Sequence, residues 1–147
     1  MIDKSHIGHS FEPFTVDIEK GRLKFFAHAT EQNDPIYFDE ETARAAGYSG
    51  LPAAPTFLFS VDLEQDDPMG FLDLLGVDIA RLLHGEQEFE YHHPICAGDS
   101  ITLQSRIVDI YDKKNGAMEF VVQTFKATNQ RGEHVADMTR TLVVRNQ

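Results

Sequence analysis

The sequence contains one cysteine, no tryptophan and no apolar run long enough to cross a membrane. Cys96 alone can form neither an internal disulfide nor a cysteine-based metal site, which suits a reducing compartment. Spanning a bilayer takes roughly 20 consecutive apolar residues. The opening MIDKSHIGHSFEPF also lacks the apolar centre of a secretory signal. We therefore expect a soluble, cytoplasmic protein with no membrane partner.

Basic residues are scarce as well. Lys and Arg number 13 against 24 Asp and Glu, which gives a net charge of -11. Binding to DNA or RNA depends on a clustered basic surface, so the composition argues against a nucleic-acid partner. An anionic ligand would be repelled unless basic side chains gather locally, for which Arg22, Lys24 and Arg44 are the candidates.

The first half of the chain has helical patterns. A length of 147 residues with 41% hydrophobic residues suits one domain, residues 1–147. The apolar spacing predicts a helix over 17–29 capped by Asp17, and a second over 39–47 that begins at Asp39. Residues 55–61 are apolar on nearly all sides, which predicts a buried helix with Pro55 in its first turn. A shorter helical piece is expected within 71–83.

The second half alternates with the period of strands. The pattern predicts four successive antiparallel strands, over 86–92, 100–111, 118–129 and 135–144. Turns are expected at 113–116, 129–132 and 97–99. Helices followed by an antiparallel sheet give an α+β fold class.

Four segments in this order resemble a known family: TVDIEKGRLKFFAHAT, DPIYFDEETARAAGYSGLPAAPTF, GEQEFEYHHPICAGDSI and the final TLVV. Together they resemble the MaoC-like family, and within it the N-terminal type of FAS1-like dehydratase domain. The resemblance implies a hotdog fold, in which an antiparallel sheet wraps around one long central helix. It also implies reversible hydration of 2-enoyl thioesters carried on coenzyme A or acyl carrier protein, with no other cofactor.

The resemblance places the family's acid/base pair at altered positions. Catalytic relatives use an aspartate and a histidine to move protons between water and substrate. With Pro35 as the anchor, the aspartate position holds Gln32 and the histidine position holds Tyr37. An amide is not a general base, and a phenol with a pKa near ~10 is a poor one at neutral pH.

The resemblance also places the thioester carbonyl at the start of the central helix, where we expect substrate contacts from Pro55, Thr56 and Phe57. Active relatives polarise that carbonyl with backbone amides, but proline has no N–H to donate, which leaves Thr56 as the amide donor. Whether the chain is an enzyme by itself is therefore open. The resemblance implies a subunit that shapes the acyl tunnel beside a catalytic MaoC-type hotdog partner.

Other readings of the same residues remain. Asp34 or Asp39 could belong to a relocated acid/base pair, and Asp39 or Glu64 could serve a hotdog thioesterase. Asp34 is more simply a turn residue that bonds the backbone. A third reading is a noncatalytic homodimer that binds acyl-coenzyme A.

The histidines show no metal-binding spacing, so we predict no metal site. His92 and His93 are neighbours at the end of a predicted strand, where their side chains should diverge. They are weak catalytic candidates, and a structural role is favoured for both. His84 is predicted to lie in a loop, and Cys96 to be an ordinary exposed or half-buried thiol.

Overall fold

The structure is a computed structural model that describes residues 1–146. Its strands are β1 (Phe14–Asp17), β2 (Leu82–Tyr91), β3 (Ser100–Lys113), β4 (Met118–Thr128) and β5 (His134–Arg145). Its helices are α1 (Lys20–Ala29), α2 (Glu40–Ala45), α3 (Phe57–Asp62) and α4 (Gly70–Leu75), with short 3-10 turns η1 (Lys4–His6), η2 (Pro35–Tyr37) and η3 (Ile79–Arg81). None of the helices in residues 1–146 has both the length and the apolar character needed to cross a membrane.

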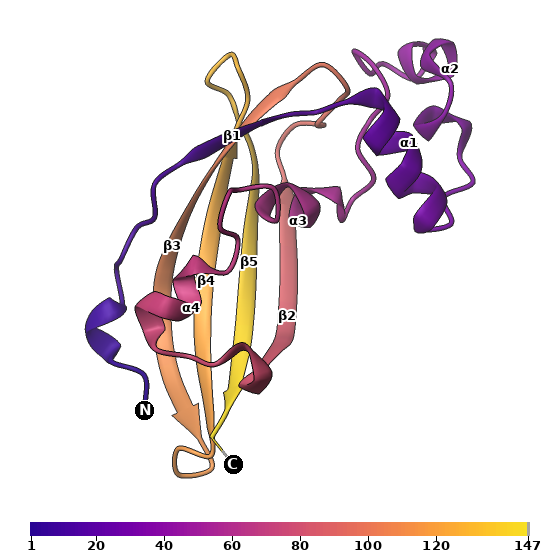
Figure 1. Cartoon of the computed structure of the whole chain (residues 1–147). Coiled ribbons are helices and arrows are strands. Elements are labelled where there is room, and N and C mark those ends of the chain that lie inside the picture. Colours follow the sequence, from indigo (N-terminus) through magenta and orange to yellow (C-terminus); the bar gives the residue numbers. More distant parts are fainter. Residues whose placement is uncertain (147) are drawn as a thin grey trace.

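The strands form one antiparallel sheet in the order β1-β3-β4-β5-β2. The four strands predicted from alternation are confirmed, and the class is α+β as expected. Their spatial order differs from a simple meander, because β2 pairs with β5 across the sheet and not with its neighbour in sequence, β3. As a result β2 is paired on one side only and forms an edge of the sheet (Figure 1).

A fifth strand replaces part of a predicted helix. The expected helix start at Asp17 is wrong: Phe14–Asp17 is β1, paired with the first residues of β3, and α1 begins only at Lys20. Asp17 does not cap a helix, since its carboxylate accepts a hydrogen bond of 2.5 Å from the Ser100 hydroxyl. The alternation of Phe14 and Val16 was too short to stand out before its partner strand was known.

Helices α3 and α4 lie against one face of the curved sheet, while α1 and α2 form a lobe beyond its end (Figure 1). Two apolar clusters fill the space between the layers. One includes Leu58 and Val61 of α3, and the other includes Phe71 and Leu75 of α4. The buried helix predicted over 55–61 is present as α3, with Phe57, Leu58 and Val61 buried. It ends after six residues and a loop separates it from α4, so two short helices replace the long one that the resemblance implies.

The predicted turns are confirmed. The loop between β3 and β4 has Lys114, Asn115 and Gly116 at positive φ, a conformation that glycine and asparagine adopt most readily. Asn129 fastens the next turn, because its side-chain oxygen accepts from the amides of Arg131 (3.0 Å) and Glu133 (3.1 Å).

Two single-residue predictions are corrected. His84 lies within β2, where it packs beside Phe59 at 5.2 Å between ring centroids, and not in a loop. Cys96 is buried rather than exposed or half-buried, because the segment before β3 packs into the core under Pro52. Burial withdraws this thiol from solvent.

Candidate functional site

The two positions that should carry the acid/base pair lie in the loop between α1 and α2. Gln32 is half-buried, and its backbone N–H donates to the Ala27 carbonyl at 2.9 Å at the end of α1. Tyr37 lies in η2, where burial and then the proximity of Tyr48 and Asp34 raise the pKa of its phenol. The phenol therefore stays protonated at neutral pH, and neither position offers a general base.

The nearby carboxylates already have structural partners. Asp34 caps η2 by accepting from the Ile36 amide at 3.0 Å, as predicted for a turn residue. Asp39 caps α2 by accepting from both the hydroxyl (2.6 Å) and the amide (2.7 Å) of Thr42, and these bonds lower its pKa. Each carboxylate is therefore used as a capping group.

Glu64, the other candidate for a thioesterase, lies just after α3 and forms an ion pair with Arg22 of α1. The pair joins the helix lobe to the layer of α3. This carboxylate is therefore engaged by a cation, which weakens it as a nucleophile or base.

The first turn of α3 is the second part of the site. Pro55 is exposed, and its carbonyl accepts a hydrogen bond from the Tyr91 hydroxyl at the end of β2. Burial raises the pKa of Tyr91 to about 12, so this hydroxyl remains a donor. The backbone N–H of Phe57 donates a hydrogen bond of 2.9 Å to the Ala54 carbonyl. Thr56 precedes the helix with an exposed side chain that makes no capping bond.

An apolar groove of about 330 Å³ separates α1 from α3. It is lined by Gly21, Arg22, Phe25, Phe26, Phe57 and Ser60. Phe57 forms its buried floor, with the Phe26 ring edge-on at 5.3 Å. Phe25 is 77% exposed on the rim, an unusual position for a large apolar side chain. The structure thus brings Phe57 to a cavity, whereas Gln32 and Tyr37 lie outside the groove's lining.

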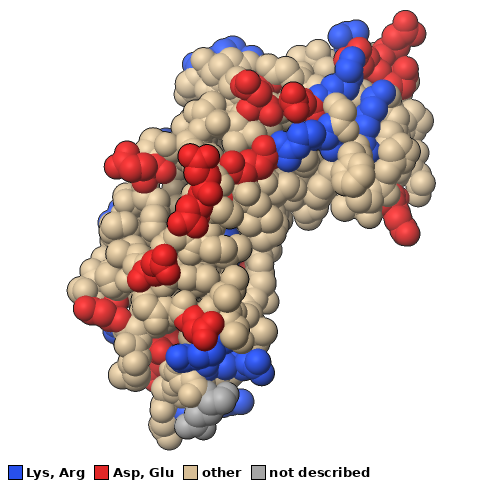
Figure 2. Space-filling view, in the orientation of Figure 1, with Lys and Arg blue, Asp and Glu red and all other residues tan. Residues whose placement is uncertain are grey.

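The sequence raised the question whether basic side chains gather locally, and in the structure several of them lie on α1. Figure 2 shows them over the lobe, beside the acidic side chains that begin α2. Lys20 pairs with Glu40 at 3.3 Å, and the Asp39 carboxylate is close enough to Lys24 to feel its charge. The basic side chains of α1 are therefore balanced by carboxylates, with Lys20 paired to Glu40 and Arg22 to Glu64.

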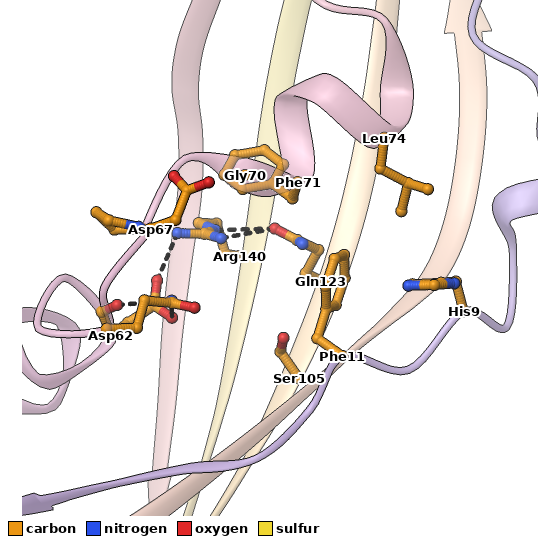
Figure 3. A pocket seen from close by; sticks show the side chains of 12 residues that line it. His9, Phe11, Asp62, Asp67, Gly70, Phe71, Leu74, Ser105, Gln123 and Arg140 are labelled. Atoms are coloured by element: carbon orange, nitrogen blue, oxygen red, sulfur yellow. Dashed lines mark hydrogen bonds and ion pairs between the residues drawn. The ribbon is translucent and has the colours of Figure 1, made fainter.

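A second cavity, of about 210 Å³, lies between α4 and the sheet and was missed by sequence analysis (Figure 3). The Arg140 guanidinium lies in its wall, donating to Asp62 at 2.8 Å and to the side-chain oxygen of Gln123 at 2.7 and 3.1 Å. The rings of Phe71 and Phe125 lie 5.1 and 4.9 Å from the guanidinium carbon. Burial raises the pKa of Asp62 and lowers that of Arg140, in each case against the effect of the ion pair.

The signal for this cavity was present in the sequence. Arg140 lies between two threonines of a strand, with Met138 and Leu142 at alternate positions that face the core. A charged residue at an inward position requires a buried partner, and Asp62 at the end of an apolar helix was the available acid.

His92 and His93 follow β2, and both of their amides donate to the Val135 carbonyl, at 2.9 and 3.1 Å. The His92 ring meets Asp137 and His134, a grouping that sequence spacing did not reveal. His93 is exposed. Neither histidine lines the α1–α3 groove.

Comparison with known proteins gives a consistent result. Residues 5–138 match the model of the family described as FAS1-like, dehydratase domain region. A UPF0336 protein of Saccharopolyspora erythraea is 36% identical over 146 residues, which cover 98% of this chain and 92% of that protein.

Two solved structures from Mycobacterium tuberculosis share the fold. The C-terminally truncated HadBC complex, a (3R)-hydroxyacyl-ACP dehydratase, matches with a TM-score of 0.79 and 26% identity, over 93% of this chain and 96% of that one. The ChsH1-ChsH2 complex matches with a TM-score of 0.73 and 23% identity, over 92% and 84%. The hotdog fold inferred from the sequence is confirmed, and the chain belongs to the family described as FAS1-like, dehydratase domain region.

Proposed function

We propose that this chain is the substrate-shaping subunit of a (3R)-hydroxyacyl thioester dehydratase, equally a 2-enoyl thioester hydratase, and that a second hotdog chain supplies the acid/base pair. The observation that carries the proposal is the occupancy of the dyad positions by an amide, Gln32, and by a phenol with a raised pKa, Tyr37. Hydration needs a group that accepts a proton from water near neutral pH. These positions offer none.

The family and the fold argue that the scaffold has kept its ligand class. The match extends over most of the chain, and one similar structure is a dehydratase complex that acts on hydroxyacyl-ACP. The groove between α1 and α3 has the apolar lining that an acyl chain prefers, with Phe57 as its floor. Arg22 lines the same groove, where its guanidinium could exchange its ion pair with Glu64 for the phosphate of a carrier, either coenzyme A or acyl carrier protein.

The edge of the sheet supports a partner. β2 has ten residues and is unpaired on one side, a geometry that accepts another strand through backbone hydrogen bonds. The surface is hollowed where the lobe overhangs this edge (Figure 2). We propose that a second hotdog chain pairs with this edge of β2.

The competing functions fit the geometry less well. A relocated pair or a thioesterase would need a free carboxylate, but Asp39 caps α2 and Glu64 pairs with Arg22. A noncatalytic homodimer that binds acyl-coenzyme A would use the same groove without a partner. Activity measurements separate these cases.

The test uses crotonyl-coenzyme A and a longer 2-enoyl-coenzyme A, with the purified chain alone and co-purified with a hotdog chain that has the Asp/His pair. Loss of enoyl absorbance and release of free thiol are followed together. We expect hydration only with both chains present. Efficient hydration by this chain alone contradicts the proposal, and thiol release indicates a thioesterase. If the co-purified chains show neither hydration nor thiol release and this chain binds acyl-coenzyme A tightly, the result indicates the noncatalytic homodimer.

A further inference from the structure

Three potential metal ligands meet at the end of the sheet where β2 finishes and β5 begins. His92 Nε2 lies 2.8 Å from one carboxylate oxygen of Asp137, and His134 Nε2 lies 2.9 Å from the other. The two imidazole rings are 4.5 Å apart between centroids. The two oxygens of the Asp137 carboxylate therefore each contact the Nε2 atom of one histidine, and the two histidines are distant in the sequence.

Backbone hydrogen bonds hold the three residues in place. The His92 amide donates to the Val135 carbonyl at 2.9 Å, which ties the end of β2 to β5. Asp137 pairs with Glu90 of β2 in the same ladder. On the other side Asn129 closes the turn before His134 by accepting from Glu133. The ligands thus project from a rigid frame, which lowers the entropic cost of binding.

The spacing of the ligand atoms suits a small metal ion. The two nitrogens and the nearer carboxylate oxygen all lie within 4.8 Å of one another. Zn²⁺ binds such atoms at about 2.0–2.2 Å, which places neighbouring ligands about 3.3 Å apart in a tetrahedron. Because these side chains are 34 to 41% exposed, rotation about their side-chain bonds is enough to close the difference.

The charges around Asp137 are mixed. It faces Glu90 on one neighbouring strand and Lys126 on the other, and Arg106 lines the same surface hollow as Lys126 and Asp137. Like charges directly opposite in a sheet repel one another, so a divalent ion bound at Asp137 would relieve its repulsion with Glu90.

We propose that His92, His134 and Asp137 form a Zn²⁺ site, with a fourth position left for water or for a group from a bound partner. Two imidazoles and one carboxylate are donors that zinc accepts, and they are poor donors for Mg²⁺ or Ca²⁺. The site is separate from the α1–α3 groove and adds a function that the acyl-thioester proposal does not contain. Bound zinc would fasten the end of the edge strand β2 to β5.

The test measures Zn²⁺ affinity of the untagged, chelator-stripped full chain by competition with a chromophoric chelator. We expect one Zn²⁺ per chain, no competition from Mg²⁺ or Ca²⁺, and weaker binding as the pH falls, because protons compete for the imidazoles. Loss of a ligand's hydrogen-bond partner alone costs about 10–100-fold in affinity. Removal of a ligand itself in His134→Ala or Asp137→Asn should therefore weaken binding by at least ~30-fold.

His93→Ala is the matched control, since His93 adjoins His92 and is exposed but lies outside the cluster. Its affinity should stay within about twofold of wild type, and His92→Ala provides a second ligand variant if His134→Ala folds poorly. Co²⁺ in place of zinc should give the intense visible bands of a four-coordinate site. Equal affinity of wild type and the ligand variants overturns the proposal. So does a loss in His93→Ala that matches His134→Ala, or the pale spectrum of aqueous Co²⁺.

Discussion

Arg140 and Asp62 form an ion pair of 2.8 Å inside the molecule, with side chains only 5 and 1% exposed. The pair joins the end of α3 to the middle of β5. Asp62→Ala would leave the Arg140 charge buried without its partner, which costs about 3–5 kcal/mol in the free energy of unfolding. Urea unfolding followed by circular dichroism measures this loss.

Replacing the whole buried network around Arg140 should have a much smaller effect than breaking the ion pair. Replacing Asp62, Gln123 and Arg140 together by Leu, Leu and Met removes the three fully buried polar side chains of the network and leaves the half-buried Gln65 bonded to the carbonyl of residue 62. Exchanging a buried ion pair for apolar residues of similar size is often neutral or stabilising, so the triple variant should unfold within ~2 kcal/mol of wild type. Arg131→Ala, in an exposed pair with Glu133, should change nothing measurable. An Asp62→Ala loss as small as that of Arg131→Ala would show that the pair does not support the fold.

Local pattern predicted the long strands and the buried helix α3 well and the start of the first helix poorly, for one physical reason. Strands β3, β4 and β5 are long enough for alternation to be read directly, and each ends at a turn with its own residue signature. β1 has four residues and exists because of β3, more than eighty positions away. The contact between Asp62 at the end of α3 and Arg140 likewise joins residues far apart in the sequence.

The candidate site likewise has a part that local sequence predicts and a part that only the fold brings together. The altered positions Gln32 and Tyr37 could be found from the order of residues around Pro35, because a motif is local. The inward position of Arg140 could be read from the alternation of its strand, but its partner Asp62 comes from a distant helix. The grouping of His92, His134 and Asp137 joins two strand ends, so spacing along the chain does not reveal it.

Tyr37 provides a direct test of the noncatalytic assignment. In the complex with a dyad-bearing partner, Tyr37→Phe and Gln32→Ala should each keep the hydration rate within about twofold, whereas a general acid or base contributes about 10²–10⁴-fold. Steady-state hydration of crotonyl-coenzyme A provides the measurement. Changing the partner's aspartate to asparagine is the matched control and should abolish activity. A hundredfold loss in Tyr37→Phe would assign catalysis to this chain.

Phe25 tests the use of the α1–α3 groove. Its side chain is 77% exposed, so Phe25→Ser should change the free energy of unfolding by no more than about 0.5 kcal/mol. If the rim holds the acyl chain or the partner, the same change should weaken acyl-coenzyme A binding or complex formation by about fivefold or more, since a buried phenyl group is worth roughly 1.5–3 kcal/mol. Isothermal titration and size-exclusion chromatography measure the two.

Ile79 supplies the control for Phe25. It is 60% exposed, lies in η3 before β2 and does not line the groove, so Ile79→Ser removes a similar apolar surface elsewhere. Binding should be unchanged in that variant. Equal effects of the two substitutions would mean that α1 has no special part in recognition.

Tyr91 gives a pH dependence whose sign follows from its environment. Burial raises the pKa of Tyr91 to about 12, above the value near ~10 of an unfolded chain. A group whose pKa is higher in the folded state contributes stability that is complete below the unfolded pKa and is lost as the pH rises through the folded one. The advantage of wild type over Tyr91→Phe should therefore be constant up to about pH 9 and decline between about pH 10 and 12. Urea unfolding of both proteins across this range measures it, and a difference independent of pH up to 12 would show that the Tyr91 hydroxyl is not held as a protonated donor to Pro55.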